Sequence, residues 1–241
     1  MRRQPWLPLA LCVAVLSAAL FPRFGQAQAI YEPPPAQNFE GVWLIQGDHA
    51  ALHTIEGRLP PMNAAAAARY AAAIKARQAG KPDFDTIRTC RPHGFPRILF
   101  AAYPIEILQE PTQVTFIHEV HHMPHLVYLD MSLPKLDDMD PNWMGLSVGR
   151  WDGDTLIVES QGFNDLTTLD SAGLPHSTRL HVSERIRKLD ADTLEDLITI
   201  ADPQTFTKPW TTRVTYRRQP GLRLKEYACM DSNPEAGASH P

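Results

Sequence analysis

The feature that most constrains the fold is a series of short β-rich segments joined by turn sequences. β-Branched and aromatic residues are frequent in these segments, and Gly, Asp or Pro separates them. The strongest turn signal is Asp152-Gly153, and Pro220-Gly221 suits a type II turn. The three predicted hairpins pair residues 146–151 with 154–160, 180–188 with 193–200, and 212–218 with 222–229. Three hairpins in succession predict an antiparallel sheet.

Further strands are expected before these hairpins, which brings the total to nine or ten. The expected segments are 98–101, 103–108, 114–121 and 126–130, and a separate short strand is expected at 41–45, before the helix. That number of strands can close a barrel or pack as two sheets, and we expect a barrel or a strongly curved sheet. One peripheral N-terminal helix is predicted at about 63–79, capped by Asn63 and ended by Gly80 and Pro82. The predicted fold class is therefore all-β with a single helix.

The N-terminus has the three regions of a secretory signal peptide. Arg2 and Arg3 precede an apolar run at 6–21, and Ala27-Gln28-Ala29 follows as a cleavage site. We therefore expect a signal peptide at 1–29, one antiparallel β domain at 30–231 and a disordered polar tail at 232–241. The mature chain carries no predicted membrane span, and its predicted location is the periplasm or the extracellular space.

Charge and cysteine content narrow the function classes. Loss of the three arginines within 1–29 changes the formal charge from −4 to about −7, and no basic stripe remains to neutralise phosphates. Nucleic acid is therefore not an expected partner. The mature chain keeps Cys90 and Cys229, which we expect to form a disulfide in an oxidising compartment. A loop of this length contributes roughly 4 to 5 kcal/mol in the chain-entropy model.

The segment HEVHHMPH at 118–125 fits the H-E-x-x-H spacing of a zinc protease. Such a site needs a helix, because a helix returns to the same face after four residues. The flanking residues predict a strand instead, in which positions four apart lie roughly 13 Å from each other. His118 and His122 then cannot share one metal ion. Strand alternation would place Glu119 and His121 on one face, so His121 is kept as a candidate site residue.

A second group of polar residues lies between 163 and 189. A loop carries Asn164 and Asp170, and His176 and Ser177 stand just before a predicted strand. Loop residues at the rim of a sheet are well placed to contact a ligand. A His176–Asp170 pair, in which the carboxylate fixes the imidazole tautomer, would serve proton transfer.

In the strand that follows this loop, alternation places Glu184 on the apolar face with Leu180, Val182 and Ile186. A carboxyl group in that setting either has a partner or has a raised pKa. A buried structural glutamate and a catalytic acid or base remain equally open. Arg185 falls on the opposite face of the strand.

Short motifs also occur in a fixed order along the chain. They are C-R-P-H-G-F-P-R at 90–97, W-D-G-D-T-L at 151–156, F-N at 163–164, P-H-S at 175–177, E-R at 184–185, D-P at 202–203 and P-W at 209–210. In this order they resemble a large family of exported, mostly uncharacterised bacterial proteins. That family usually continues past Glu119 toward an arginine and an R-x-H-P segment, where this chain has histidines. The resemblance implies that one site contains Glu119, Asn164, Asp170, His176, Ser177, Glu184 and Arg185.

The leading hypothesis is an enzyme that performs acid–base chemistry, as a lyase, isomerase or hydrolase, on a small organic molecule in a barrel cavity. The expected catalytic residues are His176, Asp170, Glu119 and Glu184. The expected substrate-binding residues are Asn164, Ser177, Arg185, Trp143, Trp210 and His121.

Two other functions remain open. No cofactor is predicted, but a divalent metal is possible, and its ligands would be His121, Glu119 and His176. The other alternative is a non-catalytic ligand-binding or envelope interaction protein. The oligomeric state does not follow from the sequence.

Overall fold

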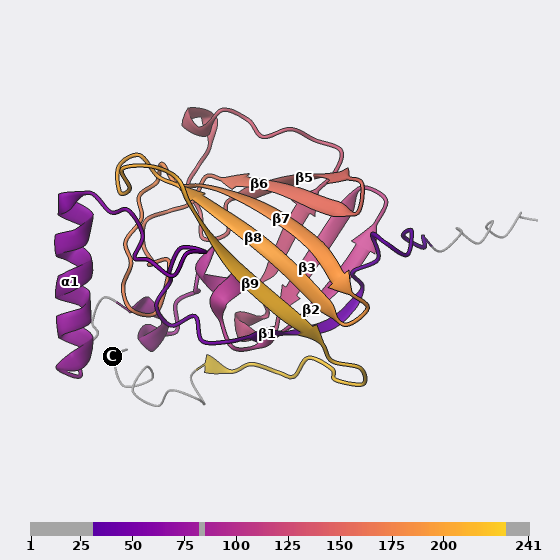
Figure 1. The fold of residues 1–241 in the computed structure, drawn as a ribbon, viewed down its shortest axis with the longest axis horizontal. Coiled ribbons are helices and arrows are strands. Elements are labelled where there is room, and N and C mark those ends of the chain that lie inside the picture. Colours follow the sequence, from indigo (N-terminus) through magenta and orange to yellow (C-terminus); the bar gives the residue numbers. More distant parts are fainter. Residues whose placement is uncertain (1–30, 82–84, 230–241) are drawn as a thin grey trace, which may run out of the picture. The chain divides into compact units, whose positions relative to one another are not determined.

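Nine strands form one closed β-barrel in the computed structural model, which describes residues 31–81 and 85–229 (Figure 1). The strands follow one another around the barrel in chain order, and β9 closes it by pairing with β1. Neighbouring strands are antiparallel except β4 and β5. Their bounds are β1 Gly41–Gln46, β2 Pro104–Glu110, β3 Gln113–His118, β4 Pro124–Tyr128, β5 Leu146–Asp152, β6 Thr155–Gln161, β7 His181–Asp190, β8 Thr193–Ala201 and β9 Trp210–Arg218. The predicted all-β barrel is confirmed.

Side-chain alternation along the strands fills the barrel interior. Buried positions recur at every second residue of β7 and β9, while the residues between them are more exposed. The interior is mostly apolar, and its fully buried members include Trp43, Ile107, Val158, Ile198 and Val214. The barrel is therefore a packed core, as expected for a small barrel.

The two ends of the barrel differ in the length of their connections. Tight turns join β2 to β3, β5 to β6 and β7 to β8 at one end. Long connections follow β1, β6 and β8 at the other end, which we call the loop end. The loop end thus brings together residues from many parts of the chain, and it is where a ligand site would be assembled.

The helix α1 spans Ala64–Gln78, and the Asn63 side chain accepts a hydrogen bond from the Ala66 amide at 2.9 Å. The predicted helix and its cap are confirmed. Only Ala66 and Tyr70 of α1 are buried, because the helix has few bulky apolar residues. The helix follows β1, so it is not the N-terminal element.

Two expected strands are corrected by the structure. Residues 98–101 were expected to be extended, but Arg97–Phe100 forms the 3-10 helix η2, whose side chains pack into the core. The strand expected at 114–121 ends at His118, and Val120–His122 forms the 3-10 helix η3. The other short helices are η1 Thr86–Thr89 and η4 Leu136–Asp138. Glu119 and His121 therefore do not alternate along a strand.

Of the three predicted hairpins, the first two are confirmed and the third is wrong. Residues 222–229 form no strand. The physical reason is closure of the barrel, because β1 already occupies the edge of β9 that a further strand would need. We call residues 222–229 the C-terminal strap.

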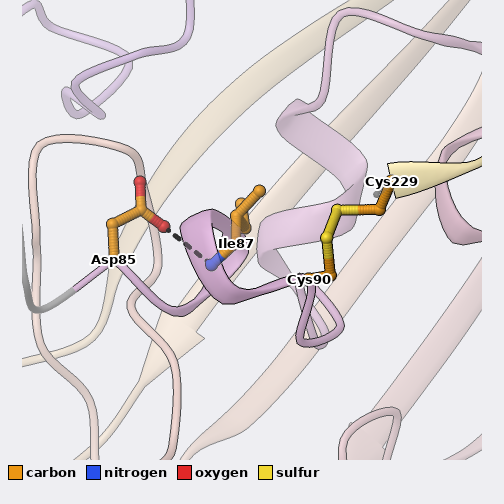
Figure 2. The surroundings of a disulfide bond; sticks show 4 residues. All are labelled: Asp85, Ile87, Cys90 and Cys229. Carbon is orange, nitrogen blue, oxygen red and sulfur yellow. Dashed lines mark hydrogen bonds between the residues drawn. A yellow bond between two sulfur atoms is a disulfide. The ribbon is translucent and has the colours of Figure 1, made fainter. Parts of the chain in front are cut away.

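The strap ends in a disulfide between Cys229 and Cys90, whose Cα atoms are 5.7 Å apart (Figure 2). The predicted pairing is confirmed, and a disulfide fits an oxidising compartment. The predicted signal peptide at 1–29 lies outside the described residues, as does the predicted tail at 232–241. Among the residues that are described, no helix is both long enough and apolar enough to cross a membrane.

Candidate functional site

Two carboxyl groups face each other inside the barrel. Glu184 on β7 and Asp196 on β8 are each 1% exposed and interact side chain to side chain. Burial, and then the charge of Asp196, raises the pKa of Glu184 well above its ordinary value. Burial is also the main reason that the pKa of Asp196 is raised to about 7. The pair therefore retains a proton at neutral pH.

The inward orientation of Glu184, predicted from strand alternation, is confirmed. The sequence reasoning missed Asp196, although the same alternation places it with the apolar residues Leu194 and Ile198. Tyr216 of β9 completes this polar group, and its hydroxyl donates to the Leu99 carbonyl at 3.2 Å. Burial and the two nearby carboxyl groups raise the pKa of Tyr216. The three side chains are enclosed by the barrel wall.

A cluster of four histidines lies near the loop end. His118 and His125 are fully buried, His93 is 8% exposed and His121 is half-buried. The His93 and His121 rings are 5.0 Å apart. Each of the four rings has one enclosed nitrogen without a protein partner: His93 Nδ1, His118 Nε2, His121 Nε2 and His125 Nδ1.

Burial keeps these imidazoles neutral. It lowers the pKa of His118 and of His125 to about 3, and the neighbouring His118 adds to the effect at His125. Burial, followed by Arg97 and the neighbouring histidines, lowers the pKa of His93 to about 2. The pKa of His121 is also lowered by burial. At neutral pH these rings act as hydrogen-bonding groups rather than as cations.

Part of the cluster belongs to a buried hydrogen-bond chain. His125 Nε2 lies 2.8 Å from the Ser147 hydroxyl, which lies 2.6 Å from the Ser160 hydroxyl. The chain links β4, β5 and β6, and the His125 ring packs between Phe95 and Phe116. With Nδ1 unpartnered, no carboxylate orients this imidazole. The arrangement stabilises the barrel where β4 and β5 share only a short parallel ladder.

The hydrogen bonds of the predicted catalytic residues Asp170, His176 and Glu119 go to other groups and not to one another. The Asp170 carboxylate accepts hydrogen bonds from the Leu52 and Leu174 amides, both at 2.9 Å. His176 Nδ1 lies 3.2 Å from the Ser177 carbonyl, and its Nε2 has no partner. The expected His176–Asp170 hydrogen bond is therefore wrong, because Asp170 holds two distant loop segments instead.

Glu119 is also separate from the other predicted acids, since its carboxylate accepts a hydrogen bond from the Lys225 amide at 2.8 Å. The predicted metal ligands Glu119 and His176 thus have different neighbours. Across the described ranges 31–81 and 85–229, no group of three or more His, Cys, Asp or Glu side chains could hold a metal ion.

The predicted substrate-binding residues Ser177, Asn164 and Arg185 also have separate partners. The Ser177 amide and hydroxyl both donate to the Asp202 carboxylate, at 2.6 and 2.7 Å. Asn164 accepts from the Leu166 amide at 3.2 Å, and Arg185 is exposed near Asp152. Ser177 therefore joins its loop to the loop that follows β8, and Asn164 stabilises its own loop. Arg185 lies on the outer face of β7, as its strand position predicted.

Trp143 is half-buried, and its backbone carbonyl accepts a hydrogen bond from the Phe95 amide at 2.8 Å. Trp210 lines a pocket of about 400 Å³ together with Ile55, Arg58 and Leu59. The latter three side chains are exposed. Trp210 Nε1 is the one enclosed, unpartnered polar atom that we find in the wall of this pocket.

Another pocket, of about 350 Å³, lies at the loop end, and several polar and charged side chains line it. Its wall includes Asp48, His49, His93, Arg97, Tyr103 and Tyr227, so we call it the Tyr227 pocket. Four separate stretches of chain contribute to it. Pockets of this size accommodate small organic molecules.

Arg97 is the cation of the Tyr227 pocket. It is 3% exposed, its Nη1 forms an ion pair with Asp85 at 3.0 Å, and it also bonds the Thr168 hydroxyl at 3.3 Å. Its Nε has no protein partner. The ion pair neutralises most of the charge of the guanidinium group, while the enclosed Nε–H has no acceptor among the described residues.

His93 and Arg97 were not among the predicted site residues. Both belong to the C-R-P-H-G-F-P-R motif at 90–97, which was used only for the resemblance. That motif was the only sequence feature that could have pointed to His93 and Arg97, because neither residue lies in a predicted strand.

Neither a protein-family model nor a curated protein matches the sequence. The family resemblance therefore stays a prediction, and the function has to be inferred from the residues of the site itself.

Proposed function

We propose that this chain is an exported binding protein for a small organic molecule, which occupies the Tyr227 pocket. The observation that carries the proposal is the state of Arg97 and His93. Both side chains are more than nine-tenths buried, both line the pocket, and each keeps one nitrogen without a protein partner. A buried polar group without a partner is costly, and a ligand that bonds to it removes that cost.

The wall of the pocket indicates the ligand chemistry. Arg97 Nε can only donate a hydrogen bond, so the ligand needs an acceptor such as a carbonyl or a carboxylate. Phe100, Tyr103 and Tyr227 supply aromatic surface. These features favour a flat, largely apolar molecule with an acceptor group at one end.

A binding role agrees better with the geometry than the acid–base enzyme does. The four residues expected to carry catalysis, His176, Asp170, Glu119 and Glu184, have different neighbours and share no hydrogen bond. His93 stays neutral because its pKa is far below neutrality. A neutral imidazole is suited to orienting a ligand by hydrogen bonding.

A fragment screen by ligand-observed NMR tests the proposal. The panel holds aromatic carboxylic acids, aromatic ketones and matched hydrocarbons without an acceptor. We expect the acceptor-bearing fragments to bind the wild type and to be lost in Ala102→Trp, which fills the pocket. Ala68→Trp, on the exposed face of α1, is the matched control and should retain binding.

Two outcomes would contradict the proposal. The first is equal binding of the fragments by Ala102→Trp and Ala68→Trp, which would place the site elsewhere. The second is conversion of a bound fragment during long incubation with the wild type but not with Ala102→Trp, which would make the pocket an active site.

A further inference from the structure

The C-terminal strap is held against the loop end by its backbone. The Lys225 amide donates to the Glu119 carboxylate at 2.8 Å, and the Lys225 carbonyl lies 2.9 Å from His122 Nε2. The Lys225 side chain makes neither contact and is exposed. At this position the loop end therefore contacts the backbone of the strap and not the Lys225 side chain.

Tyr227 of the strap packs against one member of the histidine cluster, His121. Its ring contacts the His121 ring, with centroids 5.0 Å apart, and the Tyr103 ring at 5.5 Å. The His121 ring in turn contacts the His93 ring. Because Tyr227 also lines the Tyr227 pocket, the strap forms part of the pocket wall. Its departure would open the pocket and uncover His121.

Cys229 fastens the end of the strap covalently to Cys90, beside the short helix η1 (Figure 2). Both cysteines are half-buried, and the disulfide would be cleaved by exchange with a thiolate that reaches one of its sulfur atoms. The other contacts of the strap include two hydrogen bonds to Lys225 and the ring contacts of Tyr227. The disulfide is a covalent attachment, whereas these contacts are not.

Unusual backbone conformations coincide with these attachments. Three non-glycine residues in the described part of the chain have a positive φ: Cys90 at 56°, His121 at 58° and His122 at 48°. All three contact the strap. Residues other than glycine rarely adopt a positive φ. This backbone conformation persists where contacts with neighbouring residues enforce it. The seated strap supplies such contacts at each of the three positions.

We propose that the strap is a redox-controlled gate over the Tyr227 pocket, closed when Cys90 and Cys229 are joined. A dithiol reductant opens it by breaking the S–S bond. Two electrons and two protons pass to the cysteines, which become thiols, and the reductant becomes a disulfide. The identity of the molecule that the gate admits rests on the proposed binding function. The opening of the gate itself does not depend on any ligand.

The test compares the oxidised full chain with the same protein after reduction and alkylation of its thiols. Diethylpyrocarbonate modification of His121 is measured by mass spectrometry, with exposed His53 as the internal reference. We expect the His121 rate to rise by about tenfold or more while the His53 rate is unchanged. Amide hydrogen exchange should increase at 118–122 and 222–229 and stay slow in β7 and β8.

Two results of this comparison would overturn the gate. One is unchanged protection of His121 after complete reduction. The other is faster exchange throughout the barrel, because the strap would then not open independently of the fold.

A second pair of variants keeps the disulfide intact. Glu119→Ala removes the acceptor of the Lys225 amide, and we expect it to raise strap exchange by about tenfold, as for the loss of one hydrogen bond to a charged group. Lys225→Ala is the matched control, because the strap contacts use only the Lys225 backbone. Equal exchange in the two variants would contradict the proposal. A failed fragment screen would leave these measurements unaffected, so the two proposals can fail separately.

Discussion

At the scale of single residues, ionisation of Glu184 and Asp196 should govern the loss of stability as the pH rises through neutrality. Their pKa values are raised by burial, that of Asp196 to about 7, so the folded state holds a proton that the unfolded chain has released. The resulting stability is present below about pH 4 and is lost as the pH rises through 7. Each proton changes the free energy of unfolding by about 1.4 kcal/mol per pH unit.

Glu184→Gln should therefore weaken the loss of stability between pH 5 and pH 8, because one of the two coupled protons is removed. Urea unfolding at several pH values measures this slope. Glu110→Gln, at an exposed position of β2, should keep the wild-type slope. An unchanged slope in Glu184→Gln would show that the pair ionises without cost.

His118 should lower the stability of the fold as the pH falls, whereas Glu184 and Asp196 lower it as the pH rises. Burial lowers the pKa of His118 to about 3. Between about pH 3 and pH 6.5, His118 is therefore protonated in the unfolded chain but neutral in the folded protein. The stability from this neutral imidazole is full above pH 6.5 and falls as the pH drops toward 3. His118→Leu should reduce the acid-side slope by about 1.4 kcal/mol per pH unit, measured by urea unfolding between pH 4 and pH 6.5. The exposed His53→Leu serves as the control, and equal slopes in the two variants would argue against a neutral His118.

The sequence predicted the position of Glu184 but not the neighbours of Asp170. Alternation is a local property, so it can place a side chain on the inner face of a strand. The contact between Asp170 and the Leu52 amide joins residues 118 positions apart. Nothing near Asp170 in the sequence indicates that partner, and the adjacent His176 was a plausible but incorrect choice.

At the scale of elements, the entry into β5 depends on a close approach. Gly145 has a φ of +65°, and a Cβ there would lie 2.4 Å from a Phe163 ring carbon and 2.5 Å from the Gln161 carbonyl oxygen. Gly145→Ala should therefore cost about 3 kcal/mol or more of unfolding free energy. Gly153→Ala is the control, because its φ of +63° is similar but its Cβ would meet no atom within 4 Å. Similar losses in urea unfolding would contradict the packing argument.

Element prediction succeeded where turn chemistry and alternation agree, as in the hairpin around Asp152 and Gly153. It failed for 222–229, although Pro220 and Gly221 form a good turn signal. A local pattern cannot report that β1 already occupies the free edge of β9. It also could not show that β3 ends at His118, because the η3 turn depends on left-handed conformations at His121 and His122.

At the scale of the whole molecule, the barrel strands provide the packed core, and the loops at one end of the barrel form the proposed binding pocket. The tight-turn end of the barrel joins neighbouring strands, whereas the loop end gathers distant segments around the Tyr227 pocket. The pocket could not be predicted from the sequence, because residues near 48, 93, 97, 103 and 227 meet only after the barrel has closed. The Cys90–Cys229 disulfide was predictable, since the third cysteine, Cys12, falls in the predicted signal peptide.

The most direct test of the Tyr227 pocket is a crystal structure of the protein soaked with an aromatic carboxylic acid. The proposed function predicts electron density between Tyr103 and Tyr227, with a carboxylate oxygen within hydrogen-bonding distance of Arg97 Nε. Density confined to the Trp210 pocket, with the Tyr227 pocket holding solvent alone, would contradict it.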